Sequence, residues 1–302
     1  ASLIAPQKLV LHRKTGDPMT TRPRRSVLYM PGANARALDK ARNLDADALI
    51  LDLEDSVAPD AKAEARSRVA EAVTTGGHGR RERVIRINGL DTPWGSDDMA
   101  VAVAAGPDAI LVPKVSTAED VLRAAALLWN APDHTSLWVM METPLAILNA
   151  REIAGADRRL ACLVLGTNDL VKETRASAAA ARFALVPMLS ACVLAARAFG
   201  LDVIDGVYND FRNEAGFRAE CEQGRLLGMD GKTLIHPVQI ATCNEAFSPD
   251  ADDIAWSRRV IAAFAEPDNA AKGVITIDGK MVERLHLAMA ERAVAIAEVI
   301  AS

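Results

Sequence analysis

Cysteines, aromatic residues and long apolar runs are scarce in this sequence of 302 residues. The four cysteines stand singly and none has C-x-x-C spacing, which argues against a disulfide framework and against a zinc cluster. No run approaches the roughly 18 apolar residues that a membrane helix needs. The net charge of −5 argues against a nucleic-acid surface. We therefore expect a cytoplasmic protein with reduced thiols, and neither nucleic acid nor a membrane as a partner.

Half of the residues are hydrophobic and a quarter are charged, so the chain can bury a large core. The first 22 residues are polar and basic and lack the apolar stretch of a secretory signal, which predicts a poorly ordered or artificially added tail at 1–22. Pro249 and the acidic residues after it mark a junction near Ser248. We predict a main domain at 23–247 and a C-terminal subdomain at 248–302.

Short apolar runs alternate with segments of helical periodicity from Ser26 onward, which is typical of repeated βα units with a parallel sheet. Eight such units fit a TIM (β/α)8 barrel better than an open, doubly wound sheet, which is the second choice. The predicted strands are 27–30, 48–51, 84–87, 109–112, 137–141, 161–165, 202–204 and 232–235. Beyond the eighth unit we expect a helix at 250–265, a short strand at 274–277 and an amphipathic helix at 281–300.

Polar side chains follow the predicted strands, at the end of a barrel where catalytic groups stand. Glu142 ends the fifth apolar run and Asp169 follows the sixth. If these strands are neighbours, about 4.8 Å apart, the two carboxylates can share one divalent cation. Oxygen ligands without His or Cys favour Mg²⁺, or Mn²⁺, over Zn²⁺. Arg86, at the third strand, could hold a carboxylate or a developing oxyanion across the mouth.

A structural role is the alternative for each of these residues, because strand ends are naturally polar and an isolated Asp is often a helix cap. A structural role explains the whole set of strand-end carboxylates less well. Several carboxylates at one rim repel one another unless a cation neutralises them.

The sequence also resembles a known family through a series of blocks in the same order. The match runs from about residue 24 to the last helix, and the family is the HpcH/HpaI aldolase/citrate lyase family, with its citrate lyase beta subunits, malyl-CoA lyases and citramalyl-CoA lyases. The blocks are RRSVLYMPGANARALDKA, LILDLEDSVAPDAKAEAR, VIRINGLDTPWGSDDM, METPLAI, LGTNDL, YNDFRNEAGF, GMDGKTLIHPVQI and IDGKMVERLHLA.

The resemblance implies a TIM barrel with a C-terminal helical lid and a homo-oligomer, a trimer or a hexamer. It implies Mg²⁺-dependent cleavage or formation of a carbon–carbon bond in a 3-hydroxyacyl-CoA, with an acyl-CoA and a 2-keto acid as the other reactants. In the family, the lid of a neighbouring subunit brings an acidic residue over the barrel to protonate the thioester enolate.

The same resemblance implies roles for particular residues of this chain. Glu142 and Asp169 match the two metal ligands, and Arg86 matches the arginine that contacts the substrate oxygens. The remaining matches are Glu54 and Asp55 for metal-bound waters, Gly166, Thr167, Asn168 and Asp169 for the carboxylate of the keto acid, Arg25 and Lys40 for the phosphates of CoA, and Glu283 for the acidic residue of the lid.

Glu283 departs from the family pattern, which has aspartate at this position. Its carboxylate reaches about one carbon–carbon bond farther, and a misplacement near 1 Å can cost on the order of a hundredfold in rate. We expect a lyase that acts on malyl-CoA, citramalyl-CoA or a close relative. The alternatives are a citrate lyase beta subunit that acts on an acyl group held by an acyl carrier protein, a malyl-CoA thioesterase, and a non-catalytic acyl-CoA-binding paralogue.

Overall fold

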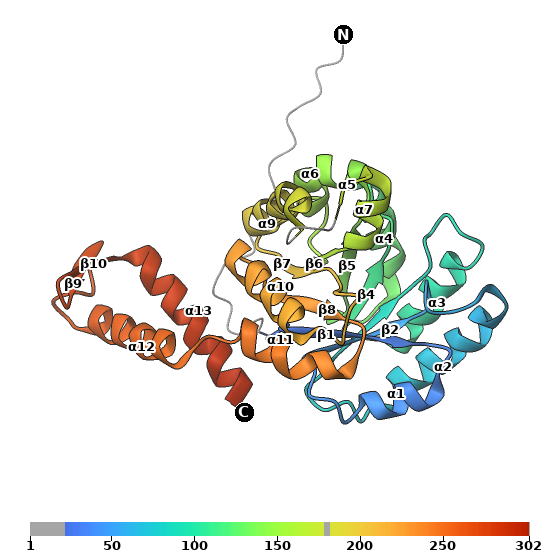
Figure 1. Ribbon diagram of the computed structural model, residues 1–302, viewed down its shortest axis with the longest axis horizontal. Helices are drawn as coiled ribbons and strands as arrows, with labels where there is room; N and C mark the ends of the chain where they lie inside the picture. The colour runs from blue at the N-terminus through green and yellow to red at the C-terminus, as the bar shows by residue number, and fades with distance from the viewer. Residues whose placement is uncertain (1–21, 178–181, 302) are drawn as a thin grey trace, which may run out of the picture. The chain divides into compact units, whose positions relative to one another are not determined.

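The computed structural model describes residues 22–177 and 182–301 (Figure 1). The tail predicted at 1–22 lies outside the described residues except for Arg22. Within the described part, eight parallel strands pair in sequence order and close into a barrel, because β1 pairs with both β2 and β8. This confirms the TIM barrel and excludes the doubly wound sheet. The strands are β1 Ser26–Pro31, β2 Ala48–Asp52, β3 Glu82–Arg86, β4 Ala109–Val112, β5 Ser136–Met141, β6 Leu160–Leu165, β7 Asp202–Asp205 and β8 Gly231–Leu234.

Each strand lies within two residues of its predicted bounds, because the apolar runs are bounded by polar residues and turns. Helices follow the strands and surround the barrel (Figure 1). They are α1 Ala35–Ala41, α2 Lys62–Thr75, α3 Gly95–Ala105, α4 Ala118–Leu127, α5 Pro144–Leu148, α6 Ala150–Ala154, α7 Thr167–Thr174, α9 Val186–Phe199, α10 Glu214–Leu227 and α11 Ile240–Phe247.

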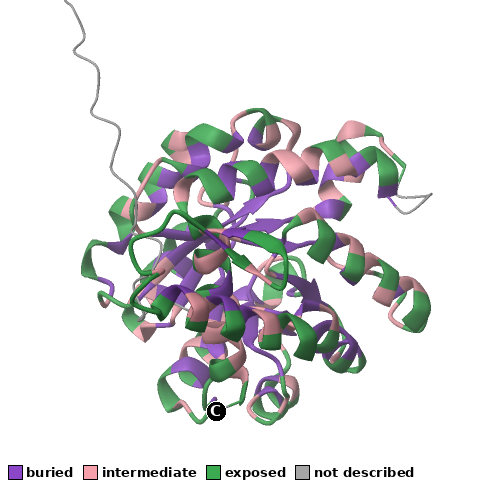
Figure 2. Cartoon of the chain, turned by 90° about the vertical axis from the view of Figure 1, so that its left-hand side faces the viewer, coloured by how far each residue is buried: buried purple, intermediate pink, exposed green. Residues whose placement is uncertain are grey.

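The core of the barrel is built from alternate residues of its strands. Ala48 and Ile50 of β2, and Trp138 and Met140 of β5, belong to one buried cluster. Because side chains alternate between the two faces of a strand, the residues two positions after Ile50 and Met140 also point into the barrel. Figure 2 shows the strands almost entirely purple, whereas the helices carry buried and exposed residues side by side.

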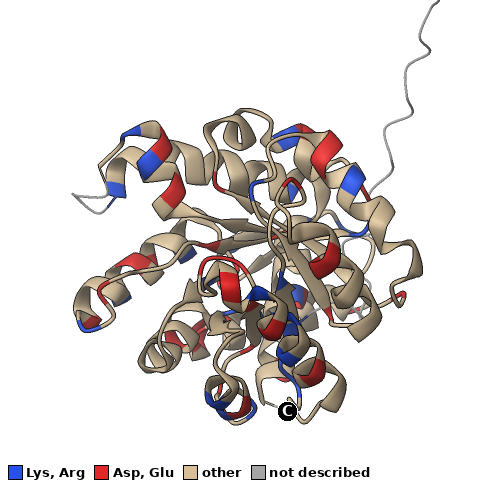
Figure 3. Cartoon of the chain, turned by 90° about the vertical axis from the view of Figure 1, so that its right-hand side faces the viewer, with Lys and Arg blue, Asp and Glu red and all other residues tan. Residues whose placement is uncertain are grey.

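The outer surface mixes the two signs of charge. On the side drawn in Figure 3, basic and acidic residues are interspersed along the helices. Among the described residues, no helix is both long enough and apolar enough to cross a membrane.

The chain divides into two compact units between Ala246 and Phe247. The described residues of the second unit form α12 Ala251–Ala265, an antiparallel hairpin of β9 Val274–Ile277 and β10 Lys280–Glu283, and α13 Arg284–Ala301. Their core contains Val260, Phe264, Ile275, Val282 and Ala290.

The helix expected from residue 281 begins at Arg284 instead, because residues 280–283 form β10. The hairpin turn consists of Asp278 and Gly279, both with positive φ (50° and 77°), which is the backbone of the turn that Asp-Gly favours. The second unit is therefore not purely helical.

Candidate metal and substrate site

Three charged side chains enter the barrel interior because of strand alternation. Asp52 continues the series of Ala48 and Ile50, and Arg86 is the last residue of β3. Glu142 directly follows β5, in phase with Trp138 and Met140. All three are at least nine-tenths buried. The carboxyl end of the barrel therefore gathers buried charge at one place.

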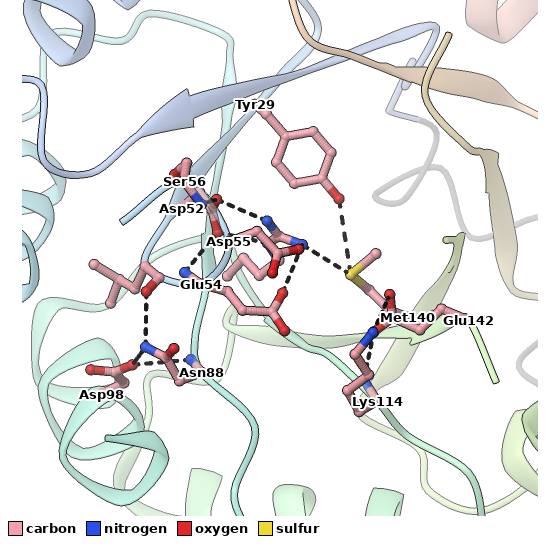
Figure 4. Close-up of polar contacts among 12 residues, drawn as sticks. Tyr29, Asp52, Glu54, Asp55, Ser56, Asn88, Asp98, Lys114, Met140 and Glu142 are labelled. Carbon is pink, nitrogen blue, oxygen red and sulfur yellow. Dashed lines mark hydrogen bonds and ion pairs between the residues drawn. The ribbon is translucent and has the colours of Figure 1, made fainter. Parts of the chain in front are cut away.

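Arg86 is held by Asp52 in a two-pronged ion pair. Nε of Arg86 donates to Oδ1 of Asp52 at 2.6 Å, and Nη2 donates to Oδ2 at 2.8 Å. The guanidinium also lies over the ring of Tyr29, 4.7 Å from its centre. Burial alone would raise the pKa of Asp52, but Arg86 and the N–H groups of Glu54 and Ser56 lower it. Asp52 is therefore an anion that fixes the guanidinium plane (Figure 4).

The remaining nitrogen of Arg86 faces the acidic pair that follows β2. Nη1 lies 2.7 Å from Oε2 of Glu54 and 3.5 Å from Oδ2 of Asp55. The Glu54 contact is an ion pair without hydrogen-bond geometry, and this buried oxygen has no hydrogen-bond partner among the described residues. Burial raises the pKa of Glu54 to about 8; Arg86 opposes this rise and Asp55 adds to it. Glu54 is thus a buried carboxyl that needs more positive charge in order to ionise fully.

Glu142 and Asp169 are bridged by the ammonium group of Lys114. Nζ of Lys114 lies 2.7 Å from Oδ1 of Asp169 and 3.5 Å from Oε2 of Glu142. The backbone N–H of Lys114 donates to Oε1 of Glu142 at 2.7 Å (Figure 4). Burial raises the pKa of Glu142 to about 7, with Lys114 lowering it and Asp169 raising it. The two predicted metal ligands, which follow the neighbouring strands β5 and β6, therefore do come together around one cation.

Gly166 makes room for Glu142. β5 and β6 pair with Met141 opposite Leu165, so the next residues, Glu142 and Gly166, lie side by side. A Cβ at Gly166 would lie 2.4 Å from Cβ of Glu142 and 2.6 Å from its Oε2. The position therefore requires glycine because of this close approach.

The loop after Gly166 becomes the first turn of α7. Thr167, Asn168 and Asp169 are its first three residues, and no described side chain caps this N-terminus. The amides of Asn168 and Asn209 pair reciprocally, at 2.8 and 3.3 Å, which links the loop after β6 to the loop after β7. Free backbone N–H groups at a helix N-terminus suit a carboxylate ligand.

Arg25 and Lys40, the two residues matched to the phosphates of CoA, lie apart from the metal-ligand pair. Arg25 immediately precedes β1, at the amino end of the barrel, and is buried in an ion pair with Asp47. Lys40 is exposed in the last turn of α1. Because the helices of such a barrel run back toward the amino ends of its strands, Lys40 also lies away from the carboxyl end. Their match to the residues that contact the phosphates of CoA stays a prediction.

Glu283 is the last residue of β10 in the second unit, in register with Val274. It is partly exposed, and its backbone N–H donates to Nδ1 of His286 at 2.9 Å.

The donor set fits a magnesium ion. The group formed by Asp52, Glu54, Asp55, Arg86, Lys114, Glu142 and Asp169 holds five carboxylates against two cationic side chains, and Lys114 already acts as a cation between two of the acids. Among the described residues, no three His, Cys, Asp or Glu side chains are clustered closely enough to hold a metal ion by themselves. Mg²⁺ suits two protein carboxylates, because it commonly keeps several waters and binds substrate oxygens as well.

The sequence prediction did not assign three residues that contact the site, namely Asp52, Lys114 and Tyr29. Asp52 could have been found from alternation, since Ala48, Ile50 and Asp52 share one face of β2. Lys114 has a φ of 56°, a backbone conformation that its sequence does not signal.

Comparisons with known proteins agree with this geometry. The chain is 51% identical over 280 residues to a (3S)-malyl-CoA thioesterase of Cereibacter sphaeroides, covering 93% of this chain and 96% of that protein. It is 37% identical over 270 residues to the citrate lyase subunit beta of Escherichia coli, covering 87% and 89%.

A solved structure of a related protein has the same fold. Protein CitE of Mycobacterium tuberculosis, in complex with magnesium, acetoacetate and coenzyme A, superimposes with a TM-score of 0.72 at 28% identity. The match covers 92% of this chain and 99% of that chain. Residues 25–237 match the profile of HpcH/HpaI aldolase/citrate lyase. The barrel and the acids at its strand ends agree with this match. This chain belongs to the HpcH/HpaI aldolase/citrate lyase family, a family of enzymes.

Proposed function

We propose that this protein hydrolyses a (3S)-malyl-CoA-type thioester with the help of Mg²⁺. The observation that carries the proposal is the 51% identity, over nearly the full length of both chains, to a protein named (3S)-malyl-CoA thioesterase. The carboxylate pair of Glu142 and Asp169, with Arg86 nearby in the barrel, supplies the kind of site that such a small, anionic acyl group requires.

Glu142 and Asp169 hold the metal in this proposal, and Glu54 and Asp55 hold its waters. When bound, Mg²⁺ polarises a carbonyl oxygen and stabilises negative charge that develops on it. The relative CitE, solved with magnesium and coenzyme A, supports both a metal and a CoA thioester as ligands here.

Arg86 orients the acyl group. Asp52 occupies two of its nitrogens, Nε and Nη2, so the guanidinium has one fixed orientation and Nη1 is directed toward the acids of the mouth. A planar guanidinium held in this way can bind a carboxylate or an oxyanion of the substrate. The uncapped N–H groups of Thr167 to Asp169 donate hydrogen bonds to the distal carboxylate of the malyl group.

Hydrolysis adds one water across the carbon–sulfur bond. The water oxygen bonds to the carbonyl carbon, the carbon–sulfur bond breaks with its electron pair on sulfur, and a proton completes the CoA thiol. The products are malate and CoA, and neither an oxidant nor a second substrate is needed.

Carbon–carbon cleavage is the second candidate, favoured by the 37% identity to citrate lyase subunit beta. Here the 3-hydroxyl loses its proton, the carbon–carbon bond breaks, and the products are glyoxylate and acetyl-CoA once the enolate is protonated. Glu283, from the second unit of a neighbouring subunit, would give that proton in a homo-oligomer such as a trimer or hexamer.

Product analysis tests the proposal. Purified protein is incubated with malyl-CoA, citramalyl-CoA or citryl-CoA, with Mg²⁺ or with a chelator, and the products are identified by mass. We expect malate and free CoA from malyl-CoA in the sample with Mg²⁺ and not in the sample with the chelator. Glyoxylate and acetyl-CoA as the main products would select the lyase. Activity only on an acyl group held by an acyl carrier protein would favour a citrate lyase beta subunit. Binding of the CoA thioesters without turnover would favour a non-catalytic paralogue.

A further inference from the structure

Lys114 stands where a divalent cation would bind. Its ammonium contacts both carboxylates that the proposed function gives to the metal, at 2.7 Å from Asp169 and 3.5 Å from Glu142. A Mg²⁺ ion lies about 2.1 Å from each ligand oxygen. An ion held by the same two carboxylates would lie beside the ammonium, and because two cations at close range repel each other, they would compete for this pair of acids.

The backbone and the side chain of Lys114 contact different oxygens of Glu142. The N–H of Lys114 donates to Oε1 of Glu142, whereas the ammonium approaches Oε2. The φ of 56° is uncommon for a residue other than glycine and carries a conformational cost. Glu142 therefore keeps its backbone hydrogen bond when the side chain of Lys114 leaves.

A pocket beside the site can receive the ammonium. It has a volume of about 260 Å³ and Lys114 itself lines it, together with Leu90, Asp91, Val115, Asp120 and Arg123. Asp91 offers a carboxylate to an ammonium, and Asp120 offers its Oδ1, since its Oδ2 accepts hydrogen bonds at the start of α4. Leu90 and Val115 offer apolar surface to the carbon stem of the lysine. Arg123, 3.5 Å from Asp120, is a loosely paired competitor that is half exposed.

We propose that Lys114 is a built-in competitor for the divalent cation, which occupies the space between Glu142 and Asp169 and turns into the neighbouring pocket when the cation binds. The inference rests on the proposed metal site. The ammonium keeps the two acids from repelling each other, and the cost of moving it weakens cation binding. Lys114 thus sets the cation concentration at which the site fills.

Cation titration tests the proposal without measuring turnover. Mn²⁺ binding is followed by electron paramagnetic resonance for the unaltered protein, for Lys114→Met, and for the control Lys172→Met, which removes the same charge from an exposed position on α7. We expect Lys114→Met to bind Mn²⁺ roughly tenfold more tightly, as losing one charge-assisted hydrogen bond implies. Lys172→Met should change the affinity less than about twofold.

A second measurement requires no variant. Acetylation of lysines in the unaltered protein, read by mass spectrometry with and without saturating Mg²⁺, should show Lys114 becoming several-fold more reactive and Lys172 unchanged. An affinity in Lys114→Met that is equal to or weaker than that of the unaltered protein overturns the inference, as does Lys114 reactivity that Mg²⁺ leaves unchanged. If the unaltered protein binds no Mn²⁺, the proposed metal site fails and this inference fails with it. Normal binding with no effect of Lys114 overturns this inference alone.

Discussion

Asp52 and Arg86 face each other inside the barrel, with both oxygens of the carboxylate bonded to two nitrogens of the guanidinium at 2.6 and 2.8 Å. Both side chains are more than nine-tenths buried. Each charge stabilises the other, because breaking a buried ion pair is strongly destabilising. Arg86 is therefore a fixed rather than a mobile cation at the mouth.

Asp52→Asn should lower stability and activity together. It removes the two-pronged ion pair of the buried Arg86 and leaves only the contacts of Nη1 with Glu54 and Asp55, which costs about 3 kcal/mol of unfolding free energy. The guanidinium also loses its orientation, and kcat/KM should fall about a hundredfold. Chemical denaturation and steady-state kinetics measure the two effects. Asp55→Asn is the matched stability control, since Asp55 is exposed and 3.5 Å from Arg86, and should cost less than about 1 kcal/mol. Equal stability losses in the two variants would refute the pairing.

Glu54 should make the stability of the chelator-treated protein depend on pH. Its pKa in the folded protein, about 8, lies above the ordinary value of 4.5. The folded state therefore binds the proton more tightly, and this contribution to stability is present below pH 4.5 and is lost as the pH rises toward 8. Glu54→Gln should reduce the fall in melting temperature between pH 5 and pH 8, while Glu142, with a pKa raised to about 7, keeps its own part of that fall. The curve of Glu54→Gln running parallel to that of the unaltered protein would contradict this assignment.

Gly166→Ala should weaken cation binding. The added methyl group would lie 2.4 Å from Cβ of Glu142 and push this side chain away from Asp169. A displacement of about 1 Å is sufficient to spoil a metal site or a catalytic geometry, so we expect at least a tenfold loss of Mn²⁺ affinity. Gly273→Ala is the control, because no described heavy atom lies within 4 Å of a Cβ there. Calorimetric titration of both variants compares them, and unchanged affinity in Gly166→Ala would contradict the close approach.

Glu283→Gln should separate the two candidate reactions. Carbon–carbon cleavage needs an acid to protonate the enolate, whereas a thiolate can leave without one. Any glyoxylate formation should therefore fall at least a hundredfold in the variant, whereas the rate of malate and CoA release should stay within a few-fold. Glu291→Gln, at an exposed position of α13, serves as the control for the product ratio. A parallel loss of both product pairs would count against this division of roles.

Much of the barrel could be predicted because each buried strand is a short apolar run with polar ends. The same pattern located Glu142 and Asp169, since neighbouring parallel strands end at the same rim. Their common partner was not predictable. The position of the Lys114 ammonium depends on a positive φ and on the rotation of a long side chain, neither of which leaves a sequence pattern.

Arg25 and β10 show two other limits. Arg25 stands before the first apolar run, and that position alone places it at the amino end of the barrel, where Asp47 binds it. The ion pair of Arg25 with Asp47 was not predicted, because the two residues are far apart in the sequence. Residues 280–283 share the helical periodicity of α13, but the Asp278–Gly279 turn returns the chain along β9, and tertiary pairing overrides the local preference.

Mn²⁺ titration of charge-neutral variants decides whether Glu142 and Asp169 together bind a divalent cation, on which both proposed reactions depend. Glu142→Gln and Asp169→Asn keep the size of each side chain, and Glu245→Gln, an acid exposed on α11 and paired with Arg218, is the control. We predict one Mn²⁺ per chain in the unaltered protein and in the control, and a loss of affinity of about a hundredfold or more in each of the other two variants. Unchanged Mn²⁺ affinity in either Glu142→Gln or Asp169→Asn would contradict a shared cation site.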